Sequence, residues 1–474
     1  MDWIVLLPPI VAIGLALWTR EVYLSLFIGL WLGTTILVGG NPVLGLRELG
    51  DQLVTVFSDA GNTRIVFFCL LVGSLIALVQ ASGGVLGFVN WAQKRGLGTT
   101  RRGAEILAWV VGMVIFVESS ITSLTVGAVS RSFFDKLKIP REKLAYYCDA
   151  TSAPVCMMLP LNGWGAYILG LLAAQGVLDS DAVGLLIGAL AFNFFAIFAI
   201  VMAFVLAFTG WSFGPMARAE KRASETGQLI REGSVPMISE DVSEIEPVAN
   251  SKYQTIDLML PIFTMIGMIF VGLYITGEGN LMKGSGSTSV LWAVATAIGV
   301  AMAMYAIPRN GKMLISPVKS TSLILKGASG LLPVTILIVF AFALGQVSRA
   351  LEMGPYLVDL IGDGAPAWWV PSLIFIIGCM ISFFLGSSWT TFAVLIPIAL
   401  PLAEGLGLSP ALMLGAVLSG GVFGDHASPL SDTSIISSMS SACDHVDHVN
   451  TQLPYTLGLA GVTVVAFIIA GLIF

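Results

Sequence analysis

Long apolar runs, separated by short polar stretches, are the feature that most constrains this sequence. As a helix, a run of about 18 residues or more can cross the roughly 30 Å hydrocarbon core of a bilayer. Only 11% of the residues are charged, whereas soluble domains average about 25%. We therefore predict an all-α polytopic membrane protein with about 10 transmembrane helices. The apolar runs cover residues 3–18, 22–39, 64–90, 104–130, 144–175, 181–209, 257–277, 288–307, 330–348, 368–402, 408–440 and 452–473.

Basic residues determine the expected topology. Lys and Arg cluster in the connections 90–103 and 131–143, and the positive-inside rule places both in the cytoplasm. The segment 104–130 between them then cannot cross the membrane and must turn back. Polar residues at 116–123 interrupt its apolar run and leave two arms of about 13 residues, each too short to span. We therefore predict a cytoplasmic re-entrant hairpin at 104–130.

A later apolar segment has the same shape. Residues 368–402 are interrupted by a polar sequence at 386–391, and the flanks of this segment contain no Lys or Arg. We predict a second re-entrant hairpin there, which enters from the outer side of the membrane. The resulting topology leaves four of the 23 basic residues outside, namely Arg47, Arg64, Lys283 and Arg349.

The predicted elements form two inverted repeats, 1–209 and 256–474, joined by a polar cytoplasmic linker at 210–255. Each repeat has three spans, a hairpin, a broken helix and a further span. Inverted repeats with discontinuous helices near the membrane midplane are a recurring plan of secondary transporters. The polar and charged composition of the linker suits a flexible, solvated connection. The broken helix and last span cover 144–175 and 181–209 in the first repeat, and 408–440 and 452–473 in the second.

Four acidic residues lie at predicted helix breaks inside the apolar segments: Glu118, Asp149, Asp425 and Asp432. A charge at the membrane centre costs roughly 2.5–3.5 kcal/mol on insertion scales, so such residues usually have a function. Prolines at the breaks free backbone carbonyls. Together with carboxylates and hydroxyls, these carbonyls form an oxygen-rich site of the kind that hard cations prefer. We predict sodium binding at Asp149, Asp425 and Asp432, and we expect no cofactor.

A structural role is the alternative for these polar residues. An intramembrane Asp can cap a broken helix, and hydroxyls at a break can satisfy the freed backbone groups. Both interpretations stay open at this stage. The other residues predicted to bind the ion or substrate are Ser119, Ser120, Thr122, Thr151, Ser152, Asn162, Ser387, Ser388, Thr390, His426, Ser428 and Thr433.

His445 and His448 lie in the polar stretch 443–448, which we predict to be a cytoplasmic connection before the final helix. A transition-metal site, a proton-sensing or gating loop and a packed structural turn are all compatible with this pattern. The five cysteines are scattered without metal-ligand spacing. They indicate small hydrophobic side chains and not a disulfide framework.

Two long motifs resemble the NhaC-type sodium/proton antiporter family. They are residues 420–433 (GGVFGDHASPLSDT) and 443–455 (CDHVDHVNTQLPY). Shorter segments in the first half, at 141–146, 149–154 and 164–167, are similar to its N-terminal counterpart. The resemblance implies the fold of the ion transporter superfamily, in which a scaffold and a mobile transport domain work as an elevator. It also implies a homodimer in the bacterial inner membrane.

The sequence thus predicts a secondary active transporter and not an enzyme, because no nucleophile and base have convincing spacing. A buried carboxylate can hold a proton near neutral pH, and sodium would compete for the same oxygens. Sodium/proton antiport by alternating access follows. The family resemblance also implies members that move organic acids or amines, so coupled transport of a small organic acid or amino acid stays open. The expected partners are membrane lipid, a small cation and a small organic solute, without nucleic acid.

Overall fold

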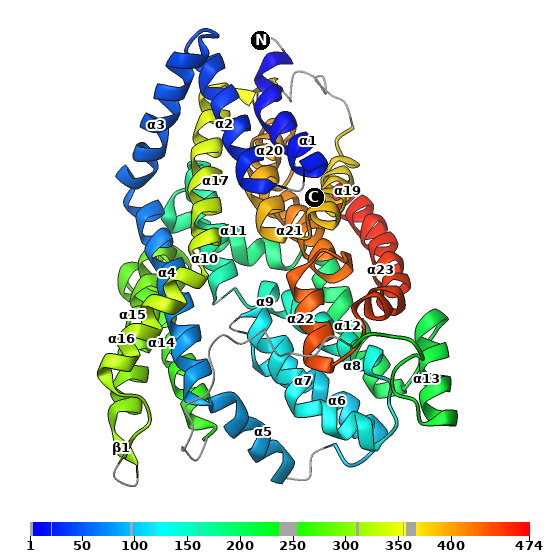
Figure 1. Cartoon of the computed structure of the whole chain (residues 1–474). Helices are drawn as coiled ribbons and strands as arrows, with labels where there is room; N and C mark the ends of the chain where they lie inside the picture. Colours follow the sequence, from blue (N-terminus) through cyan, green and yellow to red (C-terminus); the bar gives the residue numbers. More distant parts are fainter. Residues whose placement is uncertain are drawn as a thin grey trace.

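The computed structural model describes residues 3–19, 21–94, 98–116, 118–160, 162–236, 254–309, 312–353, 355–356 and 366–474. The chain is almost entirely helical over these residues, in agreement with the predicted class (Figure 1). The first part of the chain contains η1 (Trp3–Leu6), α1 (Leu7–Thr19), α2 (Val22–Leu37), α3 (Pro42–Ser58), α4 (Ala60–Ser82) and α5 (Gly84–Lys94).

The middle of the chain consists of shorter helices joined by tight breaks. It contains α6 (Arg101–Val114), α7 (Ser119–Lys136), α8 (Arg141–Ala150), α9 (Ala153–Met158), α10 (Gly163–Ala174), α11 (Asp179–Leu190), α12 (Phe194–Thr209) and α13 (Gly214–Thr226). The span predicted over 181–209 is therefore two helices, α11 and α12. They are separated at Asn193, whose side-chain oxygen accepts a hydrogen bond from Ser419 of a distant helix at 3.0 Å.

The last part of the chain begins with two long helices and a small hairpin, in which Pro308 pairs with Met313 and Arg309 with Lys312. Its elements are α14 (Ile256–Thr276), η2 (Leu281–Lys283), α15 (Gly286–Ala306), β1 (Pro308–Arg309), β2 (Lys312–Met313), α16 (Pro317–Gly330), α17 (Leu332–Ala350), α19 (Val370–Leu385), α20 (Ser388–Leu406), α21 (Pro410–Ala427), α22 (Asp432–Ser441) and α23 (His445–Ile473).

Six helices in the described part of the chain are long and apolar enough to cross a membrane, and three bent pairs would raise this number to nine. The prediction of about ten spans is close to the upper value. The sharpest bend, 111°, separates α2 from α3. Asn41 caps α3 by accepting hydrogen bonds from the backbone of Val43 and Leu44, and Pro42 occupies its first position. Both are strong helix-start signals, so α3 begins in a new direction.

Both segments predicted as hairpins are broken where the sequence indicated. In the first, α6 ends at Val114 and α7 begins at Ser119, and the two helices pack against each other. In the second, α19 ends at Leu385. The next residue, Gly386, has a φ of 65° in the left-handed region that favours glycine, and α20 begins at Ser388. Helix α21 packs against both α19 and α20.

The helices form two packed groups. The first helix group consists of α2–α4 and α14–α17, where α4 packs against α15 and α16 and α17 packs against α2. The second helix group consists of α6–α9, α12 and α19–α23. Figure 1 shows α3, α4, α15 and α16 on the left and α8, α12, α13 and α23 on the right. Helix α21, buried from Leu412 to Ala427, is the core of the second group.

The linker differs from the expected flexible connection in its first half. Residues 214–226 form α13, which packs against α8 and α23. Arg222 of α13 donates to both oxygens of Glu142 on α8, at 2.9 and 3.0 Å. Farther along, Arg231 pairs with Asp447 of α23 at 3.0 Å. Charged side chains that suggested a solvated segment therefore attach it to two helices of the second group. The remainder of the linker, 237–253, lies outside the described residues.

Candidate functional site

Asp149, in the last turn of α8, is fully buried and lies at a junction of four helices. Its Oδ2 accepts hydrogen bonds from Ser434 Oγ of α22 at 2.9 Å and from Gln452 Nε2 of α23 at 2.7 Å. His448 Nε2 of α23 lies 3.3 Å from the same oxygen, and His426 Nδ1 of α21 lies 3.7 Å away. One carboxylate from the first half of the chain thus contacts three helices of the second half.

Asp425 lies in the last turn of α21, beside the start of α20. Its Oδ1 accepts a hydrogen bond from the backbone N–H of Ser388 at 2.9 Å, where the positive end of a helix dipole favours negative charge. Its backbone carbonyl accepts from Thr433 at 2.8 Å and from Ser434 at 3.2 Å. Because the Ser434 hydroxyl also reaches Asp149, the breaks of the two predicted broken helices meet at this residue.

Asp432 and Glu118 lie next to this junction. Asp432 starts α22 and has an exposed side chain, within electrostatic range of both Asp425 and Glu118. Glu118 is half-buried and caps α7, because its carboxylate accepts from the backbone N–H of Ile121 at 2.9 Å. The Ser119 and Ser120 hydroxyls, each 3.2 Å away, also donate to Glu118. Glu118 therefore has the capping role that we considered as the alternative, close to a second carboxylate.

Asn162 holds two breaks together. Its side-chain amide donates to the carbonyls of Phe116, Cys156 and Leu159, at 2.9, 2.8 and 3.1 Å. Its side-chain oxygen accepts from the backbone of Trp164 at 2.9 Å and so caps α10. All its groups are used by the backbone, which indicates that Asn162 positions the α6–α7 break against the α9–α10 break.

Most predicted hydroxyl ligands satisfy backbone carbonyls, as the structural alternative expects. Ser387 caps α20 through the backbone N–H of Thr390, whose hydroxyl also lies 3.3 Å from the Ser387 hydroxyl. The other hydroxyl donors and their carbonyl acceptors are Thr122 with Ile115 and Glu118, Thr151 with Tyr147, Ser152 with Asp149, and Ser428 with Phe383.

Several buried polar atoms at the junction have no hydrogen-bond partner among the described residues. They include Asp149 Oδ1, Ser388 Oγ, Gln452 Oε1 and both ring nitrogens of His426. Leaving such atoms unpaired costs about 1–3 kcal/mol each. Three of these atoms are oxygens, which fit a hard cation.

The sequence interpretation missed two contributors to the junction, Gln452 and His448. His448 was expected in a cytoplasmic connection, whereas it lies in α23 and is fully buried against Asp149. His445, one turn earlier, lies 3.0 Å from Ser438 Oγ. The spacing of His448 and Gln452, four residues apart, places both on one helix face and could have predicted a shared contact. No group of His, Cys, Asp and Glu suited to a metal ion is found in the described part of the chain.

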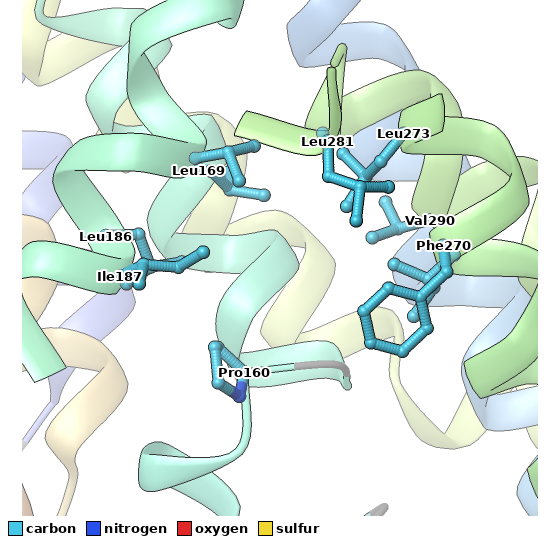
Figure 2. A pocket seen from close by; sticks show the side chains of 11 residues that line it. Pro160, Leu169, Leu186, Ile187, Phe270, Leu273, Leu281 and Val290 are labelled. Carbon is cyan, nitrogen blue, oxygen red and sulfur yellow. The ribbon is translucent and has the colours of Figure 1, made fainter. Parts of the chain in front are cut away.

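A separate apolar cavity of about 160 Å³ lies between α10–α11 and α14–α15. Figure 2 shows Leu169, Leu186 and Ile187 facing Leu273 and Val290 across it. Its lining shares no residue with the Asp149 junction and contains no charged side chain. The cavity therefore does not fit a cation, and it marks loose packing between the helices on its two sides.

The model of the Na+/H+ antiporter family matches residues 155–472, which is more than half of the chain. The chain belongs to the Na+/H+ antiporter family. The family resemblance of the motifs at 420–433 and 443–455 is thus confirmed. An uncharacterised protein of Haemophilus influenzae is 33% identical over 496 residues, covering 98% of this chain and 90% of that protein.

Two relatives with named activities match shorter parts of this transporter. The Na(+)/H(+) antiporter NhaC of Alkalihalophilus pseudofirmus is 37% identical over 108 residues, 23% of each chain. The malate-2H(+)/Na(+)-lactate antiporter of Bacillus subtilis is 31% identical over 147 residues, 27% of this chain and 31% of its own. In structure, the chain resembles the YdaH transporter of Alcanivorax borkumensis, with a TM-score of 0.54 and 14% identity over 90% of this chain and 88% of that one. The latter likeness concerns the fold alone.

Proposed function

We propose that this secondary transporter exchanges sodium for protons at the junction of Asp149 and Asp425. The observation that carries the proposal is the set of partners around Asp149. This buried carboxylate contacts a hydroxyl, an amide and two imidazoles, and none of these described partners is Lys or Arg. A buried carboxylate without a permanent cationic partner needs either a proton or a mobile cation to balance its charge.

The chemistry of the junction supports sodium as that cation. Carboxylate and hydroxyl oxygens are hard ligands, and Asp425, Asp149, Ser388 and Asp432 supply them. Metal binding requires the deprotonated carboxylates, so sodium and protons exclude each other. A site that opens to one side at a time then exchanges one ion for the other.

The movement in this proposal is an elevator displacement of the second helix group against the first, in a chain built from two inverted repeats. The break before α7 corresponds to the break before α20, and the α8–α9 break corresponds to the α21–α22 break. The first helix group serves as the scaffold and the second carries the site. The apolar cavity lies between the first helix group, at α14–α15, and the connecting helices α10–α11. In this proposal the transporter is a homodimer and resides in the bacterial inner membrane.

Coupled transport of a small organic acid is the second candidate, and two observations favour it. The Bacillus subtilis relative is named for malate and lactate. The start of α20, with Ser387, Ser388 and Thr390, presents hydroxyls at a helix N-terminus, which suits a carboxylate. Trp389 follows in the same turn, with its ring 5.5 Å from that of Trp164.

Proteoliposomes with an internal pH-sensitive dye test both candidates. Addition of sodium outside wild-type vesicles should drive protons out and raise the internal pH, while Asp425→Asn should not respond. Lithium and potassium test cation selectivity, and malate, lactate and amino acids test the second candidate. Absence of sodium-dependent proton flux between about pH 6 and pH 9 would reject antiport. Robust flux that no organic solute alters would reject the second candidate.

A further inference from the structure

Gln452 lies on the buried face of α23 next to the junction, and its side chain is 1% exposed. Its Nε2 donates to Asp149 Oδ2 at 2.7 Å and to the backbone carbonyl of His426. Gln452 lies within the motif at 443–455, but the proposed set of cation ligands does not include it. Its position next to the unbalanced carboxylate raises the question of what its carbonyl oxygen does.

The hydrogen bonds fix the orientation of the amide. An amide group has two donor hydrogens at its nitrogen and only acceptor lone pairs at its oxygen. Both atoms that Nε2 contacts, Asp149 Oδ2 and the His426 carbonyl, are acceptors. The flipped amide would place oxygen against oxygen with no proton between them. Oε1 must therefore point away from these two atoms.

In this orientation Oε1 is buried and has no hydrogen-bond donor among the described residues, and the same is true of Asp149 Oδ1. The two side chains are joined through their other atoms, so the free oxygens belong to one hydrogen-bonded unit. Ser388, whose Oγ is also buried and unpartnered, belongs to the α20 start that contacts Asp425. Three buried oxygens without hydrogen-bond partners among the described residues at one junction are what a bound cation would satisfy.

We infer that Gln452 Oε1 is a neutral ligand of the transported cation, beside Asp149 Oδ1. The inference rests on the proposed cation exchange and adds a ligand to the same site. A neutral amide oxygen paired with a carboxylate contributes to coordination without adding charge. Gln452 therefore affects the affinity for sodium relative to lithium. The net charge of the site is determined by the carboxylates alone.

Two substitutions separate ligation from positioning. Gln452→Glu keeps an oxygen in place of Oε1, and Gln452→His keeps an N–H donor for Asp149 but removes the oxygen. A ligand role predicts that Gln452→His weakens sodium binding by about 10–100-fold and changes the sodium/lithium ratio, while Gln452→Glu binds sodium. A role limited to positioning Asp149 predicts the reverse order, since only the donor then matters.

The measurement is equilibrium binding of radiolabelled sodium to the purified full chain at fixed pH, with lithium as competitor. Thr456→Val is the matched control, because its hydroxyl is buried one turn later on α23 and donates only to its own helix, at Leu453. It should bind sodium like the wild type. Unaltered binding and selectivity in Gln452→His overturns the inference and leaves cation exchange standing. A wild type that binds neither sodium nor lithium overturns both.

Discussion

The two ends of α8 hold buried charges in opposite ways. At its start, Lys143 Nζ lies 2.9 Å from Glu105 Oε2 and 2.7 Å from Glu220 Oε1. At its end, Asp149 is just as buried, but its partners are neutral hydrogen-bond donors and two imidazoles. The first cluster balances its charges within the protein, and the second does not.

The balanced cluster extends to the linker. Arg101 also pairs with Glu220, and Tyr147 donates to Glu105 at 2.9 Å. Removing one partner of such a buried pair typically costs about 3–5 kcal/mol, because a charge is left uncompensated. Among the described residues, Asp149 has no Lys or Arg partner that would be left without its opposite charge if Asp149 were removed. The comparison separates acids that hold the fold together from an acid that is available for a transported ion.

The largest effect is expected from a substitution at Asp149, the buried acid without a described Lys or Arg partner at the end of α8. Asp149→Asn keeps the shape of the side chain and removes its charge, so sodium-driven proton flux should fall by about 100-fold or more. The purified variant should remain monodisperse with an unchanged melting temperature, because no opposite charge loses its partner. Flux in proteoliposomes and size-exclusion chromatography measure the two quantities. Flux within a few-fold of the wild type would place the essential charge elsewhere.

A substitution in the balanced charge cluster at the start of α8 should mainly lower the stability of the protein. Lys143→Met leaves Glu105 and Glu220 facing each other and should destabilise the protein by about 3–5 kcal/mol. Denaturant unfolding of the purified protein in detergent measures this loss. The double variant Lys143→Met with Glu105→Gln should recover part of it, since one stranded charge is then gone. A double variant no more stable than the single one would mean that charge balance is not what Lys143 provides.

The sequence located the helix breaks well because their causes are local. Polar residues at 116–123 and 386–391 interrupt apolar runs, and the breaks of the structure fall at or beside them. Prolines and carboxylates similarly marked the breaks after Asp149 and Asp425. These signals act within a few residues and can be read from one segment alone.

The partners of the buried charges could not be predicted in the same way. Asp149 meets Ser434 and Gln452 across separations of 285 and 303 residues, and Arg222 meets Glu142 across 80. Sequence shows an ionisable residue in each place, but whether a Lys or a neutral donor faces it depends on how distant helices pack. For that reason the linker was expected to be flexible, although its charges pair with α8 and α23.

A smaller effect tests how α13 is attached to α8. Arg222 contributes two hydrogen bonds to a Glu142 side chain that is 2% exposed, in addition to the ion pair of Glu220 with Lys143. Arg222→Met should destabilise the protein by about 1.5–3 kcal/mol, the usual loss for hydrogen bonds to a charged group. Lys221→Met is the matched control, because Lys221 is 73% exposed and lies 4.0 Å from its partner Glu225. Equal melting temperatures of the two variants would show that α13 is held by its apolar contacts and by the Glu220–Lys143 ion pair instead.

The smallest effect is expected at the pair of Arg231 and Asp447, which is more exposed than the ion pairs along α8. Arg231 pairs with Asp447 but is itself 58% exposed, so Arg231→Met should cost no more than about 1 kcal/mol. Salt screens exposed pairs, with a Debye length near 10 Å at 0.1 M and about 3 Å at 1 M. The stability difference from the wild type should therefore shrink as salt rises. Choline chloride is the appropriate salt, because sodium would bind at the proposed site. A difference that stays large at high salt would mean that Arg231 and Asp447 behave as a buried ion pair. The contrast between this exposed pair and the buried pairs at the start of α8 would then fail.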